Sequence, residues 1–252
     1  MFIFVNTCLN ILFLVNFISL HSPLLFMRVG VLFSGGKDSC LALKKVMEKE
    51  EAVCLITVIS KNKESFMFHT PNIHLTEMQA EAIGLPLVSI ESKGLKEEEL
   101  GDLKEVIAMA KEVFGIEGVA TGTIESVYQA TRIQKICDEL GLWCFNPLWQ
   151  KNQVEILKEV VKEGFDAVIT GVFAEPFDSK WLGRKIDERV AEELEKMGEE
   201  YFINPSGEGG EIETTVLDAP FFKKRIKIEK SKKEETKDSG VLNIEKAVLV
   251  KK

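Results

Sequence analysis

RVGVLFSGGKDSCLAL, residues 28–43, joins an apolar run to a helical pattern through the short loop SGGKDS. VGVLFS (29–34) predicts a buried strand, and the segment from Asp38 to about Lys49 predicts a helix. A glycine-rich turn between a strand and a helix brings together unpaired backbone N–H groups and the positive end of the helix dipole. The stretch therefore predicts the first strand of an α/β sheet and, directly after it, a phosphate site.

The loop SGGKDS, residues 34–39, is called the phosphate loop below. Its glycines, Gly35 and Gly36, let the backbone bend and approach a ligand closely. Its two serines offer hydroxyls, Lys37 adds a positive charge, and Asp38 suits a helix N-cap or a magnesium contact. The spacing matches neither G-x-x-x-x-G-K-[ST] nor G-x-G-x-x-G, so the two commoner nucleotide loops are excluded. The residues expected to bind phosphate are Ser34, Gly35, Gly36, Lys37, Asp38 and Ser39.

Outward from this loop, short apolar runs alternate with helical patterns as far as residue 149. The predicted strands after the first are 52–59, 85–91, 118–124 and 142–149, and the predicted helices between them are 75–84, 95–115 and 127–141. Alternation at this spacing predicts a five-stranded, parallel, doubly wound sheet. Gly122 falls at the carboxyl end of the fourth strand, where open α/β sheets bind ligands, so we expect it to border the nucleotide.

The second half of the chain predicts a smaller C-terminal α+β domain. VEILKEVVKEGF predicts a helix, DAVITGVF a strand, and residues 186–198 another helix, followed by the acidic, glycine-rich stretch GEGGEIET. RIKIEK and VLNIEKAVLV alternate on either side of Asp238-Ser239-Gly240 and predict a hairpin. We place the domain boundary near residue 150, giving domains of 27–150 and 151–252.

Composition limits the classes of function. The 252 residues carry a net charge of −8, which argues against a general nucleic-acid binder. Residues 223–252 hold eleven Lys and Arg against five Asp and Glu, and so form either a solvated, charged ribbon or a docking surface for an acidic macromolecule. Five cysteines without a CxxC pair suit a reducing cytoplasm, and three histidines make a histidine-rich metal site improbable.

Residues 1–26 are apolar enough to suggest a hydrophobic leader or a membrane anchor. The first Lys or Arg in the chain is Arg28, however, and the predicted first strand begins directly after Met27. We therefore interpret this segment as an over-extended start with Met27 as the initiator, with a real anchor as the alternative, and expect no membrane association.

SGGKDS after a first strand resembles the PP-loop of the N-type ATP pyrophosphatases. The resemblance implies the fold of the adenine nucleotide alpha hydrolases, also called the HUP fold. It also implies that residues 34–39 hold the departing pyrophosphate while AMP is transferred to a substrate oxygen, with ATP and Mg²⁺ as cofactors and Asp38 as the metal contact.

Several blocks further on resemble the diphthine–ammonia ligase family, and the likeness spans Met27 to about Lys224. They are TGTIESVYQATRIQKICDELGL, NPLW, GVFAEPFDSKWLGRKID and NPSGEGGEIETTVLDAPFF. Members of this family amidate the carboxylate of diphthine, a modified histidine of translation elongation factor 2, with ATP and ammonium. The resemblance implies AMP and pyrophosphate as products, elongation factor 2 as protein substrate, and a cytoplasmic enzyme that binds no nucleic acid stably.

These blocks supply the remaining candidate residues. Catalytic roles are expected for Lys37, Asp38, Glu211 and Glu213. Substrate contacts are expected from His69, Arg132, Trp181, Arg184 and Glu208. Glu211 or Glu213 would steer ammonium, favour its deprotonation or bind magnesium. Each candidate has a plainer interpretation as well: a surface arginine for Arg132, a packed aromatic in a turn for Trp181, and a solvated loop for the glutamates. Ala130 departs from the basic residue expected after Tyr128-Gln129, which puts one substrate contact in doubt.

Two other functions use the same loop. An enzyme that thiolates transfer RNA would need a reactive cysteine or a cysteine-bound cluster, and none of the five cysteines is an obvious candidate. A non-enzymatic ATP sensor would bind ATP without releasing pyrophosphate. A glutamine-fed amidotransferase is not expected, because no glutaminase-sized segment is left in the chain, so free ammonium or a partner must supply the nitrogen. A homo-oligomer is left open.

Overall fold

The structure of the chain is a computed structural model that describes residues 26–62, 71–95, 98–236 and 239–252. His69 and nearly all of the apolar N-terminal segment lie outside the described residues, so their predicted roles are not tested. In the part of the chain that is described, no helix is both long and apolar enough to cross a membrane.

The first half forms the predicted five-stranded parallel sheet. Its strands are β1 (Arg28–Leu32), β2 (Glu51–Ser60), β3 (Leu87–Ser92), β4 (Gly118–Ala120) and β5 (Trp143–Phe145), in the spatial order β3-β2-β1-β4-β5. Strands β4 and β5 are shorter than the apolar runs predicted. The chain turns away at Thr121, whose hydroxyl donates to the side-chain oxygen of Asn146 and accepts from the backbone N–H of Thr123. These bonds end both strands at the same edge of the sheet.

The strand order reverses between β1 and β4. From β1 the chain builds outward through β2 to β3, and then returns to add β4 and β5 on the other side of β1. Loops that leave the carboxyl ends of two such strands diverge and open a crevice, which is where open α/β sheets bind ligands. The phosphate loop and Gly122 follow these two strands.

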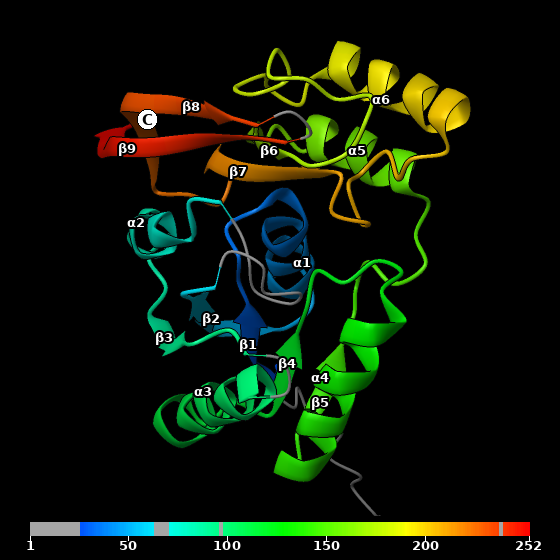
Figure 1. Cartoon of the computed structure of the whole chain (residues 1–252). Helices are drawn as coiled ribbons and strands as arrows, with labels where there is room; N and C mark the ends of the chain where they lie inside the picture. Colours follow the sequence, from blue (N-terminus) through cyan, green and yellow to red (C-terminus); the bar gives the residue numbers. More distant parts are fainter. Residues whose placement is uncertain (1–25, 63–70, 96–97, 237–238) are drawn as a thin grey trace, which may run out of the picture.

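Four helices cover the two faces of this sheet: α1 (Lys37–Met47), α2 (Thr76–Ile83), α3 (Glu98–Phe114) and α4 (Val127–Leu140). Helices α3 and α4 share one face, where Leu103, Ile107 and Ile133 pack on the strands. Helix α1 lies between the first sheet and a second sheet, as Figure 1 shows, and its Leu41 and Leu43 are fully buried. The helix that follows the phosphate loop is therefore enclosed by both halves of the protein.

The second half forms an antiparallel sheet flanked by two helices, α5 (Gln153–Lys162) and α6 (Glu188–Tyr201). Its strands are β6 (Asp166–Val172), β7 (Ile212–Asp218), β8 (Lys224–Glu235) and β9 (Gly240–Lys251), in the order β7-β6-β9-β8. The predicted hairpin is present as β8 and β9, which pair along their whole length. Strand β7 was not predicted, because its consecutive threonines look polar although both are buried.

One buried core joins the two halves. Val31 and Leu41 of the first half belong to the same apolar cluster as Ile156 and Val216 of the second. The boundary near residue 150 stays a prediction, since no break in the core marks it.

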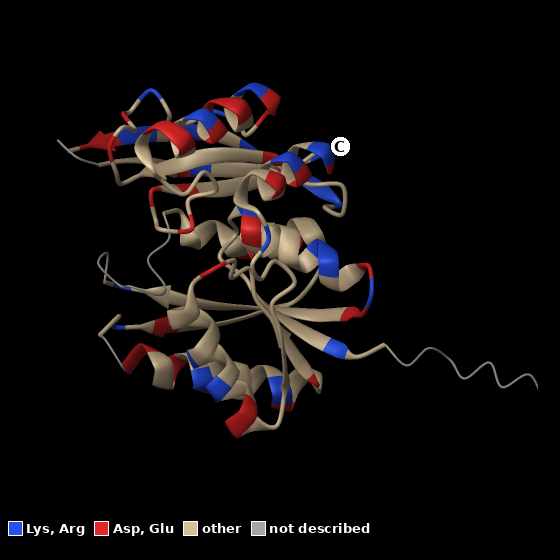
Figure 2. Ribbon diagram, turned by 90° about the vertical axis from the view of Figure 1, so that its right-hand side faces the viewer, with Lys and Arg blue, Asp and Glu red and all other residues tan. Residues whose placement is uncertain are grey.

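Part of the positive charge of residues 223–252, called the basic tail, is paired with acidic side chains. Lys230 pairs with Glu245 at 2.6 Å across the hairpin, and Lys246 pairs with Glu229 at 2.7 Å. Figure 2 shows blue and red segments side by side in the part of the molecule that contains the second sheet. These pairs agree with a solvated, charged ribbon, and the docking role of the tail stays a prediction.

Candidate active site

The phosphate loop connects the end of β1 to the start of α1 at the point where the strand order reverses. Gly36 is the N-cap of α1, with extended backbone (φ −79°, ψ 171°) and no hydrogen bond from a side chain to the cap. Gly35 has φ +79°, a conformation that glycine adopts without strain. Asp38 lies in the first turn of α1, so its predicted role as N-cap is wrong; the helix starts one residue earlier than predicted.

Strand β7 lies directly against this loop. The backbone N–H of Val216 donates to the carbonyl of Gly35 at 2.9 Å, and the backbone N–H of Lys37 donates to the Thr214 hydroxyl at 3.0 Å. The Gln79 amide of α2 donates to the carbonyls of Gly35 (2.9 Å) and Val216 (2.8 Å) and so ties loop and strand together. The roles of Gln79 and Thr214 could not be predicted from the sequence, because neither residue type has a local signature at these positions.

Lys37 is buried, with only 2% of its surface exposed. Its ammonium group donates to the Asp38 carboxylate at 2.8 Å and to the backbone carbonyl of Ser206. The other Asp38 oxygen, Oδ1, is buried without a hydrogen-bond partner among the described residues. A buried lysine beside a half-satisfied carboxylate can bind an anion and a cation at adjacent points.

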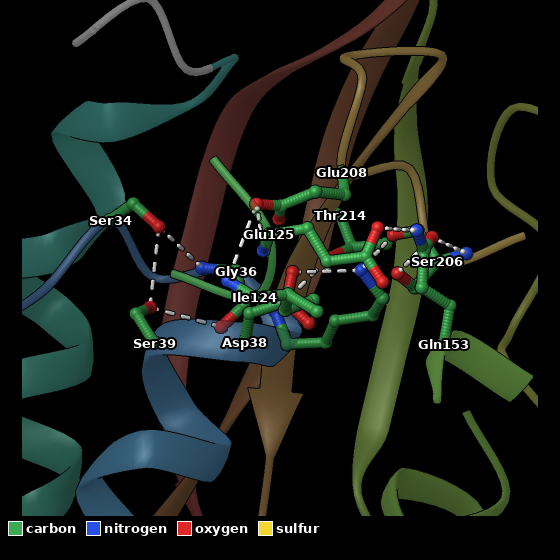
Figure 3. Close-up of polar contacts among 11 residues, drawn as sticks. Ser34, Gly36, Asp38, Ser39, Ile124, Glu125, Gln153, Ser206, Glu208 and Thr214 are labelled. Atoms are coloured by element: carbon green, nitrogen blue, oxygen red, sulfur yellow. Dashed lines mark hydrogen bonds and ion pairs between the residues drawn. The ribbon is translucent and has the colours of Figure 1, made fainter. Parts of the chain in front are cut away.

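The serines of the loop bond to each other and to the loop backbone. Ser34 donates to the Ser39 hydroxyl at 3.2 Å, and Ser39 donates to the Gly36 carbonyl at 3.1 Å, as the dashed lines in Figure 3 show. Both hydroxyls thus face the interior of the loop, and each can rotate toward a phosphate oxygen.

Gly122 lies against the first turn of α1. A Cβ atom at this position would lie 2.8 Å from the carbonyl carbon of Asp38 and 2.8 Å from the backbone nitrogen of Ser39. Both are backbone atoms and cannot swing aside as a flexible side chain would. The prediction that Gly122 borders the nucleotide thus has a geometric basis, since it lies beside the loop expected to hold the phosphates.

We expect Gly122→Ala to lower the free energy of unfolding by about 1–3 kcal/mol, the usual cost of forcing atoms into a packed site. Pyrophosphate release should fall at least about tenfold in the folded protein, because the loop must shift. Gly101→Ala is the matched control: Gly101 is exposed on α3, and a Cβ there would meet nothing within 4 Å. It should leave the activity unchanged and stabilise the helix by about 1 kcal/mol. Chemical denaturation measures the free energy of unfolding, and a pyrophosphate assay measures the activity. Equal stability and equal activity of the two variants would contradict the prediction.

Glu208 contacts the loop that leads into α4. One oxygen of its carboxylate accepts from the backbone N–H groups of Ile124 (3.3 Å), Glu125 (2.8 Å) and Ser126 (2.8 Å). Removal from water raises the pKa of Glu208, and the negative charge of Asp38 raises it further, while the three amides oppose the rise. The structure therefore shows the Glu208 carboxylate bound to the backbone of residues 124–126. Its predicted contact with substrate stays a prediction.

A polar network connects this region to the start of α5. Gln153 accepts from the Ser206 hydroxyl at 2.8 Å and donates to the side-chain oxygen of Asn204 at 2.9 Å. Asn204 donates from its backbone (3.0 Å) and from its amide (2.6 Å) to one oxygen of Glu211. Glu211 therefore holds the turn at residues 204–211 together, although its second oxygen is buried without a partner among the described residues. The predicted catalytic role of Glu211 stays a prediction.

Glu213 is partly buried on β7, one residue before Thr214. Burial raises the pKa of its carboxyl to about 7; Lys37 opposes the rise, and the charges of Asp38 and Glu208 add to it. A carboxyl with this pKa exchanges a proton readily near neutral pH, as a general base must. The structure thus brings Lys37, Asp38, Glu208 and Glu213 into one electrostatic cluster.

Three further candidates have partners of their own. Arg132 stacks over the Tyr128 ring, 3.4 Å from its centroid. Trp181 is 9% exposed and belongs to the apolar core. Arg184 lies over the Trp181 ring and pairs with Glu193 at 2.7 Å. These contacts agree with the packed-aromatic interpretation of the turn around Trp181, and a contact of the three residues with substrate stays a prediction.

The residues fit the groups that the resemblance implies. Two glycines, two hydroxyls, a lysine and an uncapped helix start suit the phosphates of ATP. The unpartnered Asp38 Oδ1 suits a magnesium ion, which prefers carboxylate oxygens. Within the described residues, no group of three or more His, Cys, Asp or Glu is placed to hold a metal ion. The predicted role of Asp38 as a metal contact stays a prediction.

Comparison with known proteins identifies both halves. The family profile described as the diphthamide synthase N-terminal domain matches residues 27–144, and that of the diphthamide synthase C-terminal domain matches residues 152–250. The chain is 36% identical over 225 residues to the diphthine–ammonia ligase of Rattus norvegicus, an alignment covering 81% of this chain and 84% of that protein. It is 33% identical to the diphthine–ammonia ligase of Homo sapiens over the same shares.

Solved structures give weaker matches. A predicted subunit of tRNA methyltransferase from Methanocaldococcus jannaschii superposes with a TM-score of 0.40 at 21% identity, covering 77% of this chain and 98% of that one. The U34-tRNA thiolase NcsA from Methanococcus maripaludis superposes with a TM-score of 0.36 at 14% identity, covering 72% and 69%. Superpositions at this level carry no argument about function.

Proposed function

Because this chain belongs to the diphthamide synthase family, we propose that the cluster around Lys37 carries out the reaction for which its relatives are named, the ligation of ammonia to diphthine. The protein is an ATP-dependent ligase of diphthamide synthesis. One observation carries the assignment of the site: the phosphate loop, Gly122 and the Glu213 carboxyl meet at the point where the strand order reverses.

The proposed reaction has two steps. In the first, a carboxylate oxygen of diphthine attacks the α-phosphorus of ATP, so that a P–O bond to pyrophosphate breaks and an acyl adenylate forms. In the second, ammonia attacks the acyl carbon, AMP departs with the electron pair of the C–O bond, and one proton is released. The products are the amide, AMP and pyrophosphate, and no oxidant or reductant is required.

We assign the first step to the phosphate loop. Lys37 and the start of α1 stabilise the negative charge that collects on the departing pyrophosphate. The serine hydroxyls and the glycine backbone orient the phosphates. Magnesium, when bound, would neutralise further phosphate charge, and Asp38 would hold it through the oxygen that has no hydrogen-bond partner among the described residues.

We assign proton removal in the second step to Glu213. Ammonium carries no lone pair and must lose a proton before it can attack. A carboxyl with a pKa of about 7 is a suitable acceptor near neutral pH. The excess of carboxylates over ammonium groups in the cluster would also attract a small cation to this place.

We further propose elongation factor 2 as the protein substrate and the cytoplasm as the compartment. The four cysteines that the structure describes are all free thiols, which suits a reducing environment.

The test combines the full chain with ATP, magnesium, ammonium and elongation factor 2 that carries diphthine. Mass spectrometry follows the modified histidine while AMP is assayed in parallel. We expect conversion to the amide with one AMP per amide formed. AMP without amide would keep the adenylation chemistry and reject diphthine as the acceptor. Binding of ATP without cleavage, over a range of acceptors, would reject the ligase and support a sensor.

The cysteines give little support to the alternative function, thiolation of transfer RNA. Burial raises the pKa of the Cys40 thiol, and it raises that of Cys54 to about 12, so neither is a thiolate at neutral pH. Cys144 is partly buried, and a hydrogen bond from the Cys137 thiol lowers its pKa. Thiolation of transfer RNA that is lost on Cys144→Ala would revive this alternative.

A further inference from the structure

Residues 204–211 contact two sets of hydrogen-bond donors in the crevice that could hold phosphate: the Lys37 ammonium and the backbone amides of residues 124–126. We call residues 204–211 the closing segment. The Ser206 carbonyl accepts from the Lys37 ammonium, and the Glu208 carboxylate accepts from the backbone amides of residues 124–126. Figure 3 shows Glu208 directed at Ile124 and Glu125 above the phosphate loop. One segment of the second half of the protein thus engages two separate sets of donors in the first half.

The loop is buried by β7 and Gln79, and the closing segment adds the contact to the Lys37 ammonium. Gly35 and Gly36 are buried, Lys37 is 2% exposed and Ser39 is 6% exposed. A triphosphate or a pyrophosphate needs these groups at its surface, because each acts through direct hydrogen bonds or ionic contact. Because Lys37 is this deeply buried, a phosphate can reach its ammonium group only if the Ser206 carbonyl moves away.

The closing segment presents the same kind of group as a phosphate ligand, namely negatively charged oxygen atoms. Glu208 offers a carboxylate to three successive backbone amides of the loop before α4, an arrangement that also suits phosphate oxygens. The contact is imperfect, since loss of hydration and the nearby Asp38 charge both raise the pKa of Glu208. A ligand that brings more negative charge, together with its own magnesium, would compete well for these donors.

The backbone of the segment is suited to movement. Gly207, Gly209 and Gly210 lie within eight residues, and Gly207 and Gly210 have φ values of +78° and +85°. Such values are costly for any residue with a Cβ atom. Gly210 has no atom within 4 Å of the position that a Cβ would occupy, so its conformation, and not its packing, requires glycine.

We propose that the closing segment occupies the phosphate-binding groups of Lys37 and residues 124–126, and that a polyphosphate must displace it to bind. The proposal rests on the proposed function only in taking this crevice as the ATP site. Residues 204–211 would then compete with ATP for these donors. Displacing them costs free energy, so the apparent affinity for the nucleotide is lower than in an open site. In this proposal Glu208 contacts the backbone amides of residues 124–126 in the closed arrangement, and its contact with substrate stays a prediction.

Titration calorimetry with inorganic pyrophosphate and magnesium tests the proposal on the full chain. Weakening the closed state raises the fraction of protein competent to bind, and the apparent Kd falls in proportion. We expect pyrophosphate to bind Glu208→Ala about tenfold more tightly than the unaltered protein. Gly210→Ala removes no charge and disfavours the closed backbone by the cost of a left-handed alanine, so we expect about fivefold tighter binding. Glu192→Ala, an exposed carboxylate on α6, is the control and should bind within twofold of the unaltered protein.

Hydrogen–deuterium exchange on the unaltered protein gives a second measurement. The backbone N–H groups of Asn204, Ser206, Gly207 and Gly210 are hydrogen-bonded in the structure. Their exchange should accelerate on addition of saturating pyrophosphate, whereas the amides of residues 124–126 should stay protected because one anion replaces another.

Weaker or unchanged pyrophosphate binding in folded Glu208→Ala and Gly210→Ala would overturn the proposal. So would slower exchange of the closing segment in the presence of pyrophosphate, or no pyrophosphate binding at all. If Glu208→Ala fails to fold, Gly210→Ala and the exchange measurement decide. None of these readouts needs diphthine or turnover, so the absence of amide formation would reject the proposed function without bearing on the closing segment.

Discussion

Lys37→Met is expected to lower the rate of pyrophosphate release by about 100- to 1,000-fold. Loss of one preorganised donor at a developing negative charge typically has an effect of this size. Methionine keeps the apolar stem of a side chain that is 2% exposed, so the packing around it is largely retained. The measurement is release of pyrophosphate and AMP at saturating ATP, magnesium and acceptor.

The control for Lys37→Met is Lys135→Ala, which removes a lysine whose side chain is 79% exposed on α4. It should leave the rate unchanged. Circular dichroism and the thermal midpoint establish that Lys37→Met is folded. A folded Lys37→Met protein with the full rate would reject the phosphate loop as the site of pyrophosphate departure.

Glu213→Gln is expected to lower amide formation by about 100-fold at pH 8, within the range for removal of a general base. The effect depends on pH with a defined sign. The pKa of Glu213 is raised to about 7, so below pH 7 the carboxyl of the unaltered protein is mostly neutral and cannot accept a proton. At a fixed ammonium concentration, the rate of the unaltered protein should therefore rise with pH through about 7 and become constant above it. The variant can use only ammonia that is already free in solution, so its rate should follow the free-ammonia concentration and show no plateau near pH 7.

Hydroxylamine gives the matching control, because it is already neutral near pH 7 and needs no base before it attacks. Hydroxamate formation in Glu213→Gln should lie within a few-fold of the unaltered protein. Equal loss with ammonium and hydroxylamine would show that Glu213 acts in adenylation or in folding, and that the second step does not depend on it as a base.

Local sequence signals were sufficient to predict the fold of the first half of the chain. A glycine-rich loop between an apolar strand and a helix depends only on neighbouring residues, and the structure has β1, the loop and α1 as predicted, with the helix starting one residue earlier. Strand–helix alternation likewise predicted five parallel strands. Gly122 was singled out because ligand sites in such sheets follow the carboxyl ends of strands, and the structure places it against Asp38 and Ser39, while its contact with nucleotide stays a prediction.

The surroundings of the loop could not be predicted in the same way. Gln79, Gln153 and Thr214 come from three elements of the fold and meet only after tertiary packing. Glutamine and threonine are common in helices and strands, and nothing in their neighbours distinguishes these positions. In contrast, the motif around Trp181 and Arg184 is conspicuous in the sequence, yet the structure accounts for both residues by packing and ion pairing.

The contact between β7 and the phosphate loop has a consequence for synthesis of the chain. Lys37 and Thr214 are 177 positions apart, so the strand that supports the loop leaves the ribosome long after the loop itself. Contacts of such long range form late in folding. A nascent chain that has completed only its first sheet therefore cannot yet hold the loop in its final form, and the capacity to cleave ATP arises only after β7 has been synthesised and has packed against the loop.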